Sequence, residues 1–197
     1  MSAAAGPGHE VLAISGSLRR GSANEVLLRA AAALAPASLR FSFYDALDTL
    51  PHFNPDLDGE GAVPPAPVAE LRRRVGGAAA LCIASPEYAH GVPGSLKNAL
   101  DWLVSAVEIV DKPIVLLNAS PSGGRHAQAA LVETLRTMST RVLLDASLLE
   151  PFLPRRLVAA GDAADLDDAA ASAAVARSMA LLARHLRDEG VDARGPV

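Results

Sequence analysis

The chain has 197 residues, of which 50% are hydrophobic and 20% charged, so it can bury a full-sized core and is not a disordered protein. Its formal net charge of −4 offers no basic surface to nucleic acid or to an acidic membrane. The single cysteine, Cys82, excludes an internal disulfide and a cysteine metal cluster. Residues 1–10 lack the features of a signal peptide, and no apolar run approaches the ~20 residues of a membrane span. We therefore expect a cytoplasmic protein that neither inserts into membranes nor binds nucleic acid.

Short apolar runs alternate with helical patterns along the whole chain. The predicted strands cover residues 9–14, 39–44, 78–84, 113–119 and 142–149, and the predicted helices cover 24–34, 67–75, 94–107, 125–140 and 165–188. The strands are almost continuously hydrophobic, which is typical of strands covered on both faces in a parallel sheet. The alternation predicts a doubly wound α/β sheet in a single domain spanning 1–197, with residues 1–8 disordered, Gly190 ending the last helix, and 189–197 as a tail.

One long segment, residues 45–66, has no clear pattern and is rich in proline. A loop of this length in a compact domain is usually functional or mobile. We expect its acidic residues, Asp56, Asp58 and Glu60, to be solvated. Cys82 lies within a buried strand pattern, which favours an inert core thiol.

The segment 15–24, S-G-S-L-R-R-G-S-A-N, lies between the first strand and the first helix. The free N–H groups at a helix N-terminus, together with hydroxyls and a guanidinium, favour binding of a phosphate. The alternative is that Ser22 and Glu25, spaced S-x-x-E, form only a capping box. A cap alone does not account for Ser15, Ser17 and Arg19 in the same loop.

Two further unusual loops follow the third and fourth strands, at residues 85–94 and 120–126. In an open parallel sheet, ligands bind beyond the carboxyl ends of the strands, so these loops are expected beside the phosphate site. Each has a simpler interpretation: a strand-to-helix turn for 85–94, and a flexible connection with Ser122 as a helix cap for 120–126.

Several other site motifs are missing from the chain. Ser22 and Ala23 replace the Lys and Ser/Thr of a nucleoside-triphosphate P-loop, and neither G-x-G-x-x-G nor G-x-S-x-G occurs. The 5 histidines show no paired metal spacing, so we expect no metal. A Ser122–His126 catalytic pair lacks a third member.

Two motifs resemble a known family. The residues G-S-L-R at 16–19, followed by Ser22 and Asn24, resemble the GSxRxxSxN loop of the NADPH-dependent FMN reductases, which include quinone, azo-dye and chromate reductases. The second motif has P-E-Y at 86–88, P-G at 93–94, L-K-N at 96–98 and D-W at 101–102, and it resembles PEYNxSxPGxLKNAIDW. Residues 120–125 and 50–56 are similar to two further loops of that family. The resemblance covers about residues 9–141.

The resemblance implies a flavodoxin-like sheet of order 2-1-3-4-5, a bound FMN, and NADPH or NADH as co-substrate. The FMN phosphate would lie on Ser15, Ser17, Arg19, Ser22 and Asn24. The isoalloxazine ring would lie against Pro86, Glu87, Tyr88 and Gly91, with Ser120 and Gly123 near its pyrimidine edge. Family members form homodimers and often homotetramers. Ala89 and His90 stand where the family has Asn and a variable residue, and the sequence leaves open whether His90 replaces that amide.

The resemblance implies an NAD(P)H-dependent FMN reductase that passes hydride through the flavin to a quinone, a flavin or another small acceptor. No side chain is expected to be catalytic, because the flavin N5 carries the chemistry. The alternative is a flavodoxin-type electron carrier with no hydride substrate. Such carriers commonly hold the ring between two aromatic side chains, whereas only Tyr88 lies in a predicted ring loop here. The few aromatic residues favour the enzyme.

Overall fold

The computed structural model describes residues 8–59, 61–120, 123–150 and 168–192. Within them a sheet of five parallel strands has the order β2-β1-β3-β4-β5, as the flavodoxin-like prediction requires. The strands are β1 (His9–Ser15), β2 (Leu39–Tyr44), β3 (Ala80–Ala84), β4 (Pro113–Leu117) and β5 (Arg141–Val142).

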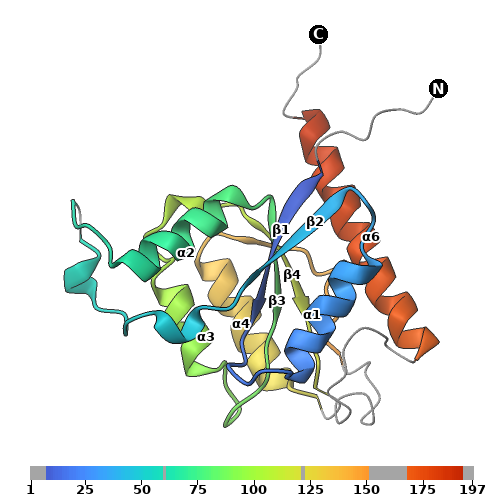
Figure 1. Ribbon diagram of the computed structural model, residues 1–197, viewed down its shortest axis with the longest axis horizontal. Helices are drawn as coiled ribbons and strands as arrows, with labels where there is room; N and C mark the ends of the chain where they lie inside the picture. The colour runs from blue at the N-terminus through green and yellow to red at the C-terminus, as the bar shows by residue number, and fades with distance from the viewer. Residues whose placement is uncertain (1–7, 60, 121–122, 151–167, 193–197) are drawn as a thin grey trace.

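Helices cover both faces of the sheet (Figure 1). On one face lie α1 (Ala23–Leu34) and α6 (Ala169–Asp192), and on the other lie α2 (Ala66–Gly77), α3 (Gly94–Asp101) and α4 (Arg125–Thr137). Alternate residues of each central strand enter different cores: in β3, Leu81 packs toward α2 while Cys82 packs toward α1. Burial raises the pKa of the Cys82 thiol to about 12, which makes it an inert core residue as predicted.

Several predicted elements are shorter than expected, and in two of them a distant side chain is the reason. The helix predicted to reach residue 107 ends at Asp101, because the Trp102 carbonyl accepts two hydrogen bonds from Arg72 of α2. The strand predicted over 142–149 pairs only at Arg141–Val142 before the chain turns. Ser147 Oγ then accepts a hydrogen bond from the Leu116 N–H of β4 at 3.0 Å, and the chain pairs with β4 again only at Leu148.

The C-terminal helix ends later than predicted, because it continues through Gly190 to Asp192 instead of stopping. An isolated glycine costs a helix only about 1 kcal/mol relative to alanine, which neighbouring turns can absorb. Asp168 Oδ1 accepts the N–H groups of Ala170 and Ala171 and caps its start. The sequence predicts disorder at residues 1–8 and a helix start at 165; residues 1–7 and 165–167 lie outside the described part. No helix in the described part has the length and hydrophobicity of a bilayer-spanning segment.

Candidate functional site

Three loops leave the sheet at the carboxyl ends of β1, β3 and β4, at the lower edge in Figure 1. We name them the first loop (residues 15–24), the second loop (85–94) and the third loop (120–126, described except for 121–122). The proximity of these loops, predicted from the sheet topology, is therefore present in the structure.

The first and second loops are in direct contact. The Gly16 N–H donates to the Ala84 carbonyl at 2.8 Å, where the second loop begins. A Cβ added at Gly16 would lie 2.9 Å from Ser85 Oγ, which is too close for a side chain. Glycine at this position is therefore required by the approach of one loop to the other.

Ser22 caps helix α1, so the capping interpretation of the first loop is correct. Its Oγ accepts the Glu25 N–H at 3.2 Å, and the Glu25 carboxylate accepts the Gly21 N–H at 2.9 Å. Arg29 forms an ion pair with the same carboxylate at 2.7 Å. The Arg29 hydrogen bond, and then the Gly21 N–H, lower the pKa of Glu25, so the carboxylate is anionic and already paired at neutral pH.

The cap leaves other polar groups of the first loop available to a ligand. Arg19 and Arg20 are exposed, and the N–H groups of the first helical turn have no partner inside the helix. Asn24 is only 6% exposed, and its Oδ1 has no hydrogen-bond partner among the described residues. A buried amide oxygen without a partner is costly, and the side-chain amide can be flipped to present its NH₂ group instead. This loop fits a phosphate, which would be contacted by cations and N–H donors together.

A pocket of about 360 Å³ opens on the β2 side of the first loop. Ser15, Ser17 and Arg19 line it, together with Phe43 and Tyr44 from the end of β2. Three of the five residues predicted to hold a phosphate therefore border open space, whereas Ser22 and Asn24 are buried and do not line this pocket.

The second loop contains a tight two-residue turn. Tyr88 and Gly91 exchange two backbone hydrogen bonds of 3.1 and 2.9 Å, and the residues between them, Ala89 and His90, have φ values of 48° and 59°. Such turns favour Asn and Gly, because both central residues adopt the left-handed conformation. Tyr88 projects from the turn and is 55% exposed.

The second loop is fastened to helix α4. The Glu87 carboxylate accepts the Ala127 N–H at 2.9 Å, in the first turn of that helix. This hydrogen bond, together with that from the His126 N–H and the nearby histidines, lowers the pKa of Glu87. On the outer side of the same junction, the His90 and His126 rings stack with their centroids 4.5 Å apart.

Asn118 organises the third loop, and the sequence analysis missed it. This side chain is fully buried at the end of β4; its Nδ2 donates to the Gly123 and Leu149 carbonyls, and its Oδ1 accepts the Ser120 N–H. Gly123 and Gly124 have φ values of 128° and 66°, which other residues rarely adopt. An amide directly after a buried apolar strand was the signal that could have identified Asn118.

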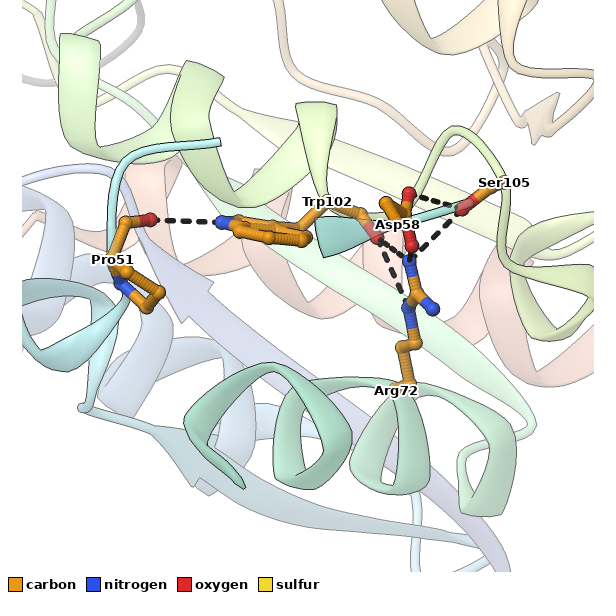
Figure 2. A network of polar contacts seen from close by, with 5 residues as sticks. All are labelled: Pro51, Asp58, Arg72, Trp102 and Ser105. Atoms are coloured by element: carbon orange, nitrogen blue, oxygen red, sulfur yellow. Dashed lines mark hydrogen bonds and ion pairs between the residues drawn. The ribbon is translucent and has the colours of Figure 1, made fainter. Parts of the chain in front are cut away.

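The long segment after β2 is fastened to α2 and to the chain after α3 (Figure 2). Trp102 Nε1 donates to the Pro51 carbonyl at 2.8 Å. Asp58 is not solvated as predicted: its side chain is 8% exposed, pairs with Arg72 at 2.7 Å, and accepts a hydrogen bond from Ser105. Asp56 is exposed as predicted, whereas Glu60 lies outside the described residues.

The sequence profile of the family described as NADPH-dependent FMN reductase matches residues 9–152. The chain belongs to this family. It is 33% identical over 144 residues to the quinone reductase of Escherichia coli strain K12, a match that covers 71% of this chain and 73% of that one. It is 39% identical over 130 residues to an NAD(P)H-dependent FMN reductase of Pseudomonas aeruginosa, covering 64% and 69% of the two chains.

Solved structures agree with this assignment. The flavoenzyme NAD(P)H:(acceptor) oxidoreductase FerB of Paracoccus denitrificans superposes with a TM-score of 0.75 at 25% identity, over 91% of this chain and 98% of that one. As a member of the NADPH-dependent FMN reductase family, the protein is an FMN-dependent NAD(P)H oxidoreductase. Family membership thus favours the enzyme over the electron carrier.

Proposed function

We propose that the first loop binds the FMN phosphate, that the second and third loops hold the isoalloxazine ring, and that the enzyme passes hydride from NAD(P)H to a quinone. The observation that carries this proposal is the direct contact of the three loops at one edge of the sheet. Gly16 joins the first loop to the second, and Glu87 joins the second loop to α4, which follows the third. The names of curated relatives, which include several quinone reductases, support the acceptor class.

The phosphate would be held by Ser15, Ser17, Arg19, Ser22 and Asn24. The Ser22 hydroxyl can serve both as cap and as ligand, because its oxygen accepts the Glu25 N–H while its own proton stays free to donate. Arg19 adds a charged donor, and the paired Glu25 presents no free negative charge to the phosphate.

Pro86, Glu87, Tyr88 and Gly91 would lie beside the ring, with Ser120 and Gly123 near its pyrimidine edge. When bound, FMN supplies the hydride chemistry. The chain itself has to bind and orient the FMN and to leave space for the substrates beside its ring. Asn118 holds the third loop so that the backbone N–H groups of its glycines can serve as donors to the electron-rich edge of the ring.

The ring should have one open face. Tyr88 is the single Phe, Tyr or Trp in the described parts of the three loops, and Trp102 is fully buried and bonded to Pro51, so it cannot stack on a ligand. With one open face, nicotinamide and acceptor must use the same place in turn.

Rapid mixing tests this proposal. NADPH alone should bleach the bound flavin, and a quinone added afterwards should restore its colour. Steady-state plots at several fixed quinone concentrations should be parallel lines, the pattern of a ping-pong mechanism. Intersecting lines would mean that both substrates bind together, and absence of bleaching by either nicotinamide would contradict the hydride route.

We further propose a homodimer or homotetramer that works in the cytoplasm. Val104, Val107 and Val110 form an exposed apolar row after α3, with 63%, 80% and 58% of their surface accessible, and this row could be covered by a second copy. Light scattering on the purified protein tests the assembly: a monomeric mass at micromolar concentration would contradict it. Cell fractionation tests the location.

A further inference from the structure

Two histidines form a stacked pair beside the proposed ring site. His90 belongs to the turn of the second loop, and His126 lies in the first turn of α4. Their ring centroids are 4.5 Å apart and the ring planes differ by 14°. Both side chains are exposed, so protons can exchange between the pair and water.

The backbone that places His90 is unusual. Its φ of 59°, like that of 48° at Ala89, lies in the left-handed region. The two hydrogen bonds between Tyr88 and Gly91 hold the turn in this form. Backbone conformations of this kind persist where the surroundings impose them and are concentrated at functional sites. Here the turn presents one imidazole to another across the gap between two loops.

Charged groups lie near the pair on both of its elements. The Glu87 carboxylate accepts the Ala127 N–H beside the pair, and this hydrogen bond, with smaller contributions from the two nearby histidines, lowers its pKa, so it is anionic at neutral pH. Arg125 adjoins His126 on α4. The Glu87 carboxylate therefore places a negative charge near the two stacked rings. Imidazole is also the side chain that ordinarily gains or loses a proton near neutral pH.

Reduction of a quinone to a hydroquinone requires one hydride and one proton. NAD(P)H is the source of the hydride in the proposed function, but nothing in that function supplies the proton. Glu87 of the second loop is not a source of this proton, because its pKa is lowered and its carboxyl group has already lost its proton at neutral pH.

We propose that the His90–His126 pair donates this proton to the acceptor. The proposal rests on the proposed function, because it requires the acceptor to lie at the second loop. The imidazolium N–H bond breaks as an O–H bond forms on the quinone oxygen, and the hydride completes the two-electron reduction to the hydroquinone. The neutral pair then recovers a proton from water, to which both rings are exposed.

The test compares two acceptors in the oxidative half-reaction of the FMN-loaded protein. A benzoquinone needs a proton with its electrons, whereas ferricyanide takes up an electron and no proton. His90→Gln and His126→Gln should slow reoxidation by benzoquinone at least tenfold at pH 7, in line with ordinary general acid catalysis. Reoxidation by ferricyanide should stay within a factor of two. His9→Gln, at the opposite end of β1, is the matched control and should change neither rate.

A second measurement needs neither flavin nor turnover. In the flavin-free protein, the NMR signal of the His90 ring followed against pH should have a different midpoint in His126→Gln, because the variant removes the neighbouring charge. An unchanged midpoint would contradict the coupling of the two rings. In the two histidine variants, an equal loss of reoxidation rate with both acceptors would contradict proton donation. An unchanged reoxidation rate with benzoquinone would contradict it as well. Failure of the proposed function is distinguishable, because NADPH would then not bleach the flavin of the unaltered protein.

Discussion

At the scale of single residues, Ala89 occupies a backbone conformation that its side chain does not favour. It is the first central residue of the Tyr88–Gly91 turn and has a φ of 48°. A left-handed conformation costs an L-residue roughly 1–2 kcal/mol, and asparagine tolerates it better than alanine. The family pattern has asparagine at this position, so alanine here makes the folded state less stable than asparagine would.

Ala89→Asn should therefore raise the free energy of unfolding by about 0.5–1 kcal/mol. Denaturant unfolding of the flavin-free protein measures this directly. Ala129→Asn is the control, because Ala129 is exposed within α4, where asparagine is a poorer helix former than alanine. That variant should be less stable than the parent. A drop in stability for Ala89→Asn would mean that the turn does not control the energetics of this loop.

Residue-level predictions from the sequence succeeded where the partners are close along the chain. The Ser22 cap lies three residues from Glu25 and could be read from spacing alone. Asp58 was misjudged, because its partners Arg72 and Ser105 follow 14 and 47 residues later. Asn118 was missed because its role depends on the carbonyl of Leu149, which the fold brings to the end of β4.

At the scale of elements, Arg72 of α2 joins the segment after β2 to the residues that follow α3 (Figure 2). Its guanidinium donates to Asp58 at 2.7 Å, to the Trp102 carbonyl at 2.6 Å and to Ser105 at 2.9 Å. The side chain is only 16% exposed, so water replaces these partners incompletely when they are removed.

A double-mutant cycle of Asp58→Ala and Arg72→Ala should give a coupling energy of about 1–3 kcal/mol. The matched control is the exposed Glu70–Arg73 pair on the same helix, where no measurable coupling is expected. Urea unfolding provides all four free energies of each cycle. Equal coupling in the two pairs would show that burial of the Asp58–Arg72 pair does not strengthen it.

The same pair should make stability depend on pH. Burial raises the pKa of Asp58, but the hydrogen bonds from Ser105 and Arg72 outweigh it and the net pKa is lowered. A lowered folded-state pKa stabilises the protein above the ordinary Asp value of about 4, and the contribution is lost as the pH falls through the lowered value. The stability difference between the parent and Asp58→Asn should therefore shrink at acidic pH. A difference independent of pH would contradict the assignment.

The predicted boundaries of helices and strands were wrong where tertiary contacts determine the true ones. The sequence predicted a helix that reaches residue 107, yet the Trp102 carbonyl accepts hydrogen bonds from Arg72 and the helix ends at Asp101. The apolar run after Val142 predicted a full strand, yet the Ser147 hydroxyl accepts the hydrogen bond of a β4 backbone N–H that a paired strand would accept. Periodicity detects which face is apolar, but it cannot detect a hydrogen bond from a distant element.

At the scale of the whole molecule, the two cores position the three loops. Alternate residues of β1, β3 and β4 are packed on both faces, which fixes the carboxyl ends of these strands side by side. This arrangement could be predicted from alternating patterns and from the family resemblance. The contacts that join the loops, such as Glu87 with Ala127, depend on the finished fold and could not.

The central claim is that the first loop binds the phosphate of FMN, and affinity measurements on the flavin-free protein test it most directly. Fluorescence quenching should show FMN binding at least tenfold tighter than riboflavin. Arg19→Ala should weaken FMN binding by about 1.5–3 kcal/mol, the range for hydrogen bonds to charged groups, and leave riboflavin binding unchanged. Arg40→Ala, an exposed arginine on β2, is the control and should affect neither ligand. Equal affinities for FMN and riboflavin, unaltered by Arg19→Ala, would contradict the phosphate site.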